Sequence, residues 1–233
     1  MSAIGLRRLG FIIAAFVLQT ALLRAALPGP DEAPARPSLA GQLLVAAPWM
    51  GDPRFERTVI LIVEHGPGGV IGIVINNPIG EQPLASVLKA LGQKDGDVTG
   101  SVRVFSGGPV QPEVGFVVHS PDYRRPETVA ITDRLSITSS IANLRDIGDK
   151  RGPAKVLVAF GYAGWGPDQL EQEIEARAWG VAEADPTLVF DEDRDNVWDV
   201  AWKRRTQHSY IEIPKIRIEK EADCSKYLVV RDR

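Results

Sequence analysis

Two apolar runs joined by a four-residue glycine-rich connection constrain this chain more than any other feature. Residues 58–64 and 70–76 are almost wholly β-branched or aliphatic, which is typical of buried strands. Between them, Gly66-Pro67-Gly68-Gly69 allows only a tight turn. A parallel pair would need a crossover of a dozen or more residues. The two runs therefore predict an antiparallel hairpin.

Other short apolar runs follow one another closely, so we expect a sheet that is largely antiparallel or mixed. The additional predicted strands span residues 42–47, 102–105, 115–119, 128–131, 135–138 and 187–190. Apolar positions at helical spacing predict helices over residues 83–91, 140–147, 167–178 and 196–204. Clustered strands with a few scattered helices indicate the α+β class.

The chain divides into a central part and two ends of different composition. Of its 233 residues, 44% are hydrophobic, and residues 39–203 are enough for one domain with its own core. Residues 1–38 comprise an apolar segment and a proline-rich tether. The tail, residues 204–233, carries short alternating runs typical of edge strands and is expected to diverge from the domain.

The N-terminal apolar run leaves three interpretations open. Arg7-Arg8 precede Leu9–Leu23, which matches the first two parts of a signal peptide. As a helix the run would extend about 22 Å, short of the hydrocarbon layer of about 30 Å. It is a secretion signal, an anchor that tethers the protein to a membrane, or translated sequence upstream of a later start. The single cysteine, Cys224, excludes an intramolecular disulfide and suits the cytoplasm, which is the expected location.

The charge balance argues against one class of partner. The formal net charge is −3, and the basic clusters Arg124-Arg125 and Lys203-Arg204-Arg205 are short. A nucleic-acid-binding domain usually shows a clear basic bias. Direct DNA binding is therefore expected to be absent.

The stretch from Gly161 to Glu171 is the best candidate for a ligand site. We expect a strand at 156–160, a sharp glycine turn and then a helix, with Tyr162 and Trp165 at the mouth of the sheet. Gly164 and Gly166 are expected to adopt backbone angles that a β-branched residue resists. Most of the Trp165 ring is expected in the core, with one edge facing a cleft. The stretch contains no obvious nucleophile, base or metal ligand.

Other residues with chemical potential are scattered along the chain. Asp52 and Arg57 flank a loop and could clamp a ligand or brace the loop itself. His65 and His119 each end a predicted strand, but Glu64 and His65 must face opposite sides, so no metal site is expected. Ser106-Gly107-Gly108-Pro109 is glycine-rich without the pattern of a phosphate-binding loop.

Three blocks of sequence resemble the AlgH/YqgE family of bacterial proteins. The first comprises Leu43 to Pro48, Met50, Asp52-Pro53, Phe55 and Arg57 to Ile60, followed by Glu64-His65, Gly72 to Asn76 and Pro78. The second comprises Gly107 to Val110 and Gly115 to Ser120, and the third Tyr162 to Pro167, Gln169 to Glu171, Glu173-Ile174 and Trp179. The resemblance covers about Leu39 to Trp202, and Asp168 departs from it by standing where the family usually has glycine.

The resemblance implies a compact α+β domain with a partly barrel-like sheet. Family members have been labelled transcriptional regulators, and their biochemical activity is not settled. We therefore expect a non-catalytic protein that regulates or binds a small ligand or a protein partner, with no cofactor. The expected ligand-binding candidates are Asp52, Arg57, Asn76, Gly107, Gly108, His119, Tyr162 and Trp165. The alternative is an enzyme acting on a small anionic substrate with His65 or His119 as general base.

Overall fold

The fold is that of a computed structural model, which describes residues 37–93, 98–139 and 141–206. Ten strands of these residues form one curled sheet. The strands are β1 (Gln42–Ala46), β2 (Val59–Gly66), β3 (Gly69–Val74), β4 (Pro78–Pro83), β5 (Ser101–Ser106), β6 (Val110–His119), β7 (Val129–Ala130), β8 (Ser136–Thr138), β9 (Val156–Trp165) and β10 (Trp179–Glu183). The helices are the 3-10 turn η1 (Pro53–Phe55), α2 (Leu84–Ala90), α3 (Ile141–Gly148), α4 (Gln169–Glu175), α5 (Pro186–Val189) and α6 (Arg194–Arg204).

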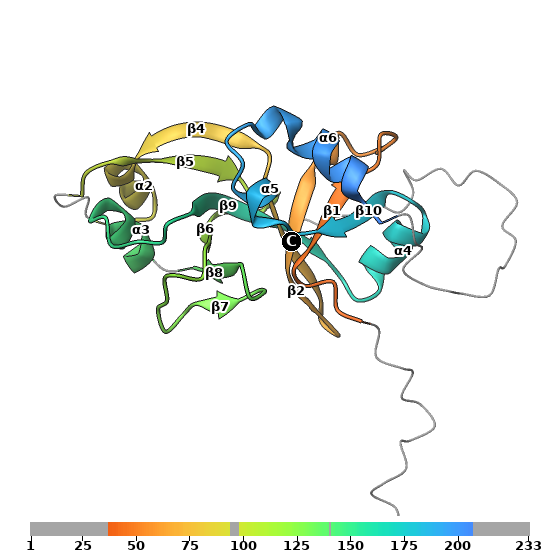
Figure 1. Cartoon of the computed structure of the whole chain (residues 1–233), viewed down its shortest axis with the longest axis horizontal. Coiled ribbons are helices and arrows are strands. Elements are labelled where there is room, and N and C mark those ends of the chain that lie inside the picture. The colour runs from red at the N-terminus through yellow and green to blue at the C-terminus, as the bar shows by residue number, and fades with distance from the viewer. Residues whose placement is uncertain (1–36, 94–97, 140, 207–233) are drawn as a thin grey trace, which may run out of the picture. The chain divides into compact units, whose positions relative to one another are not determined.

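The strand order is β10-β1-β2-β3-β9-β6-β8-β7, and off this path β5 pairs with both β9 and β4 (Figure 1). All of these pairs are antiparallel except β5 with β9. The predicted α+β class and largely antiparallel, partly barrel-like sheet are confirmed. The predicted hairpin is β2–β3, closed by the pair Gly66 and Gly69.

The central strand β9 joins the two halves of the sheet, and at Gly161 its side chains exchange the two faces of the sheet. Before this residue Leu157 and Ala159 face the inner core, whereas after it Ala163 and Trp165 face an outer core. Side chains alternate strictly along a regular strand, so one irregular residue exchanges the two faces. Gly161 has φ +75°, which a residue without Cβ adopts at little cost.

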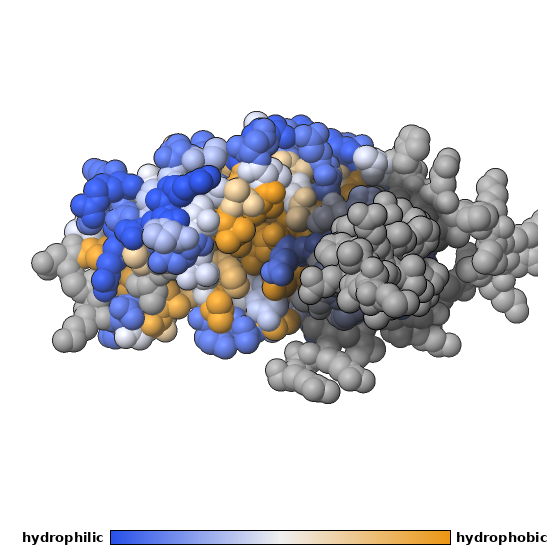
Figure 2. Space-filling view, turned by 90° about the horizontal axis from the view of Figure 1, so that it is seen from below, coloured by the Kyte–Doolittle hydropathy of each residue, from blue (hydrophilic) through white to orange (hydrophobic). Residues whose placement is uncertain are grey.

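Helices cover each apolar face of the curled sheet. The inner core is closed by α5 and α6 through Leu188, Val197 and Trp198. One outer core packs beneath α4, and the other beneath α2 and α3. Part of the apolar surface remains accessible, because hydrophobic residues gather in the middle of the face shown in Figure 2.

Two predicted elements around the central glycines are present, but their predicted bounds were wrong. The strand does not end at residue 160 but runs to Trp165, so the turn, predicted over Gly161–Pro167, is confined to residues 166–168. Helix α4 is correspondingly shorter than the predicted span 167–178, and Trp179 already begins β10. The expected strain at Gly164 and Gly166 is also wrong, because the positive φ belongs to Gly161.

The apolar run at 187–190 was predicted as a strand and forms α5 instead. Asp185 caps this helix by accepting a hydrogen bond from the Thr187 amide at 2.9 Å, and Pro186 occupies its first turn. A four-residue apolar run has too few positions to distinguish the two periods. Strands β4 and β10 were missed.

The predictions for the two chain ends concern residues that lie mostly outside the described ranges. The apolar run Leu9–Leu23 and the tether up to residue 36 lie there, as do residues 207–233 of the tail. Within the described ranges, no helix is both long enough and apolar enough to cross a membrane.

Candidate functional site

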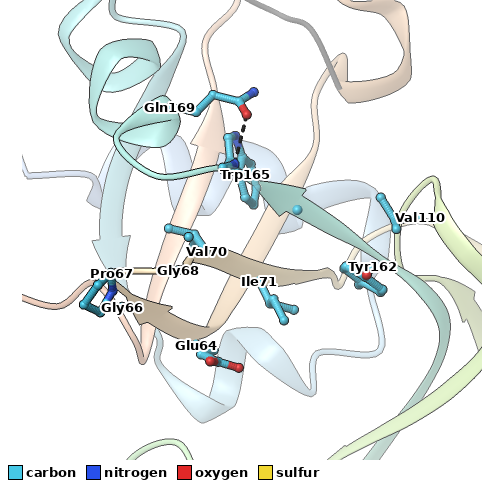
Figure 3. A pocket seen from close by; sticks show the side chains of 13 residues that line it. Glu64, Gly66, Pro67, Gly68, Val70, Ile71, Val110, Tyr162, Trp165 and Gln169 are labelled. Atoms are coloured by element: carbon cyan, nitrogen blue, oxygen red, sulfur yellow. Dashed lines mark hydrogen bonds between the residues drawn. The ribbon is translucent and has the colours of Figure 1, made fainter. Parts of the chain in front are cut away.

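A cleft of about 810 Å³ opens where the β2–β3 turn meets the end of β9 (Figure 3). The turn contributes one rim, and Val110 at the start of β6 contributes the opposite one. The lining residues are Glu64, Gly66, Pro67, Gly68, Gly69, Val70, Ile71, Val110, Tyr162, Gly164, Trp165, Gly166 and Gln169. The stretch singled out in the sequence therefore forms one wall of a real cleft.

Strand register explains the floor of the cleft. Glu64 pairs with Ile71, and Ile71 pairs with Gly164, so these three positions form a row on one face of β2, β3 and β9. Tyr162 lies two residues before Gly164, on the same face, and pairs with Val110. Because Gly164 has no side chain, the row is open at its β9 end. A Cβ there would meet only the Tyr162 ring, at 3.4 Å.

Trp165 forms part of the wall but is anchored in the core. Its side chain is 6% exposed, and its ring packs edge-on against Trp179 at 6.0 Å. The indole Nε1 donates to the buried carboxylate of Glu173 at 2.9 Å, and Trp179 Nε1 donates to the same oxygen at 2.8 Å. Gln169 donates to the other oxygen of Glu173 at 2.9 Å. The expected placement of Trp165, with most of the ring in the core beside a cleft, agrees with this geometry.

His65 faces away from Glu64, as the alternation of a strand requires. Its Nδ1 accepts from the Leu39 amide at 3.0 Å, so the proton of the ring lies on Nε2. Nε2 then donates to Glu171 Oε1 on α4, also at 3.0 Å. Both ring nitrogens therefore hold the start of the domain against α4, and neither is directed into the cleft.

His119 is fully buried and lies in a directed chain of hydrogen bonds. The Ser120 carbonyl can only accept, so His119 Nδ1 donates to it at 2.8 Å. Nε2 then accepts from the Thr138 hydroxyl at 2.9 Å, and Thr138 in turn accepts from Thr128. Burial lowers the pKa of His119, which favours the neutral ring that this chain needs.

The lowered pKa of His119 predicts a loss of stability on mild acidification. The unfolded chain binds a proton at this histidine below about pH 6.5, whereas the folded chain resists it. The free energy of unfolding should therefore decrease as the pH is lowered below about 6.5. This group contributes at most about 1.4 kcal/mol per pH unit to the decrease. Urea unfolding between pH 5 and 7.5 measures the slope, and His119→Gln should flatten it.

The aspartates with lowered pKa, Asp52, Asp122, Asp146 and Asp185, affect stability in a separate pH range. The carboxylates add to the free energy of unfolding at pH values above their ordinary pKa near 3.8, and this stabilisation is lost only at lower pH. An unchanged slope in His119→Gln between pH 5 and 7.5 would contradict the assignment to His119.

The residues of the β1–β2 loop brace the loop and do not reach the cleft. Asp52 caps η1 and binds the Arg54 side chain at 2.7 Å, which lowers the pKa of its carboxyl group. Arg57 pairs with Asp199 on α6 at 2.6 Å and covers the Trp198 ring. Asn76 donates to the Arg57 carbonyl and accepts from the Val59 amide, each at 2.8 Å.

Gly107 and Gly108 form a backbone crossing and not a ligand cradle. Gly107 donates its amide to the Phe160 carbonyl at 2.7 Å and accepts from the Val74 amide at 2.8 Å. A Cβ on Gly107 would overlap the Gly161 carbonyl, and one on Gly108 would overlap the Tyr162 backbone. The two glycines are therefore required where the β5–β6 connection passes over β9.

Of the eight candidate residues from the sequence, the structure brings Tyr162 and Trp165 together at the cleft. The other six do not line it: Asp52, Arg57, Asn76, Gly107, Gly108 and His119. The sequence did not indicate Ile71, Val110 or Gln169 as lining residues. Their signal was weak, since an apolar residue in a strand, such as Ile71 or Val110, or a polar residue at a helix start, such as Gln169, resembles many others in the chain.

Comparison with known proteins identifies close relatives. Residues 43–209 match the family described as AlgH-like (DUF179). A UPF0301 protein from Jannaschia sp. (strain CCS1) is 44% identical over 165 residues, which is 70% of this chain and 86% of the relative. A UPF0301 protein from Rhodospirillum rubrum is 42% identical over 153 residues, covering 66% of this chain and 80% of the relative.

Two solved structures share the fold. The solution structure of the AlgH protein from Pseudomonas aeruginosa matches with a TM-score of 0.63 and 35% identity, over 76% of this chain and 92% of that one. The crystal structure of protein DIP2367 from Corynebacterium diphtheriae matches with a TM-score of 0.56 and 26% identity, over 79% and 93% respectively.

Proposed function

This chain belongs to the AlgH-like (DUF179, UPF0301) family, and we propose that it is a non-catalytic protein that binds a small ligand in the cleft between the β2–β3 turn and β9. The observation that carries the proposal is the open row at Gly164, flanked by Ile71, Val110 and the Tyr162 ring. Apolar clefts with a few polar groups are the usual form of a small-molecule site.

The polar groups around the cleft support binding more than turnover. Glu64 and Tyr162 are the ionisable side chains of the lining. Both nitrogens of His65 and both of His119 are engaged in hydrogen bonds with protein atoms. A general base must reach the proton that it abstracts, and neither ring is directed into the cleft.

A regulatory role would follow from ligand occupancy and not from direct contact with DNA. The net charge of −3 gives little attraction for a polyanion. The family has been labelled as transcriptional regulators, and an indirect action through a ligand or a protein partner is compatible with that label.

Filling the floor of the cleft tests the proposal. Gly164→Val places two methyl groups in the open row, and the backbone of Gly164 is not in the left-handed region, so the fold should tolerate the change. We expect the free energy of unfolding to change by less than about 1 kcal/mol, while binding of the neutral aromatic probe phenylbutanol weakens by about tenfold or more. NMR titration of the full chain with this probe measures both site and affinity.

Gly164→Ala provides the graded control, because its single methyl group meets the Tyr162 ring at an ordinary contact distance. Gly164→Ala should weaken the binding of phenylbutanol less than Gly164→Val does. If Gly164→Val binds phenylbutanol as the natural protein does, or if the shifts lie away from the lining residues, the cleft is not the binding site.

A further inference from the structure

An unpaired carboxylate gives the cleft a chemical preference. Glu64 lies at the edge of the apolar row and is exposed, and no cation among the described residues lies within ion-pair distance of it. The described lining contains no lysine, arginine or histidine. Glu64 is therefore the charged side chain of the described lining.

The remaining polar group of the floor is the Tyr162 hydroxyl, which forms no hydrogen bond with the described part of the chain. The Tyr162 ring packs against Phe116 in a T-shaped arrangement at 6.1 Å, and its Cδ2–Cε2 side is the part nearest to Gly164. The ring thus supplies apolar surface beside the open row, and its hydroxyl oxygen can accept a hydrogen bond from a ligand. The charge preference of the row is set at its other end, by Glu64.

Strand spacing sets the size of the ligand. Glu64 on β2 is separated from Gly164 on β9 by one intervening strand, and neighbouring strands lie about 4.8 Å apart. The backbones of Glu64 and Gly164 are thus about 10 Å apart. Figure 3 shows Glu64 and Ile71 projecting to the same side of the hairpin, with Trp165 on the other side.

We propose that the cleft binds an amphipathic amine, with its apolar or aromatic body over Gly164 between Ile71 and Tyr162 and its ammonium group at Glu64. The proposal rests on the small-ligand function proposed above and adds the chemical class of the ligand. A carboxylate or phosphate ligand would place like charges together at Glu64 and is disfavoured.

The test compares three probes with one skeleton and different charge: phenylbutylamine, phenylbutanol and phenylbutyrate. NMR titration of the full chain follows the amide signals of the cleft at low ionic strength, where exposed charges are least screened. We expect the amine to bind about threefold to fivefold more tightly than the alcohol, the range for an exposed ion pair, and the carboxylate to bind most weakly.

Glu64→Gln should reduce amine binding to within about twofold of alcohol binding and leave alcohol binding unchanged. The matched control is Glu175→Gln, which removes the same charge from an exposed position on α4 outside the cleft and should preserve the preference.

Equal affinities for the three probes at the cleft would overturn the amine preference while leaving the small-ligand function intact. A preference that survives Glu64→Gln would also overturn it. If none of the probes shifts the cleft signals at millimolar concentration, the proposed function fails together with the amine preference.

Discussion

Gly108→Ala is expected to destabilise the domain by more than about 4 kcal/mol, enough to prevent folding of a protein of ordinary stability. Gly108 has φ +148°, and an added Cβ would overlap backbone atoms of Tyr162 and Ala163. Backbone atoms of a central strand cannot move aside as a flexible side chain would. Relief would require separating β9 from the β5–β6 connection, and thus the two halves of the sheet.

Gly80→Ala is the matched control for this prediction. Gly80 has φ +131°, but a Cβ there meets no atom within 4 Å. Its effect should be limited to backbone strain of about 1–3 kcal/mol. Denaturant unfolding, or soluble yield where the variant does not fold, compares the two. Similar losses for Gly80→Ala and Gly108→Ala would mean that the crossing is not closely packed.

The glycine crossing also shows where prediction from the sequence stops. The strands of the β2–β3 hairpin were predictable because their pattern and their turn are local. The meeting of Gly107 and Gly108 with Gly161 joins residues more than fifty positions apart. In the sequence these glycines resemble a ligand-binding loop, because glycine serves close backbone approach to a ligand and to another strand equally well.

The missed elements have a related cause. Strand β4 contains two prolines, two polar residues and a glycine, and it exists because β5 supplies its hydrogen-bonding partner. Strand β10 pairs with β1 at the other end of the domain. Local propensity is weak in both segments, and tertiary pairing decides their conformation.

The candidate site was predicted in part for the same physical reason. Tyr162 and Trp165 were found because they lie in one local stretch beside a strand end. Glu64 was considered only as a metal ligand beside His65, since the sequence does not show that it aligns with Ile71 and Gly164 across three strands. Register between distant strands is what converts these separate residues into one cleft.

Trp165→Ala is expected to destabilise the domain by about 3–5 kcal/mol, the usual range for removing a large buried aromatic side chain. The ring is 6% exposed and packs against Trp179, so its loss opens a cavity in the outer core beneath α4. The change also leaves Glu173, which is buried, with one hydrogen bond fewer. A midpoint of urea unfolding equal to that of the natural protein would show that Trp165 belongs to the cleft alone.

Two further variants separate packing from hydrogen bonding at Trp165. Trp165→Phe retains much of the ring but loses the N–H donor, and it should cost about 1–3 kcal/mol through the weakened solvation of the Glu173 carboxylate. Glu173→Leu removes the acceptor and leaves the buried indole N–H groups of Trp165 and Trp179 without their partner, so it should cost more than Trp165→Phe. The opposite order would mean that the indole groups find water in place of Glu173, and that the wall of the cleft is wetter than its burial indicates.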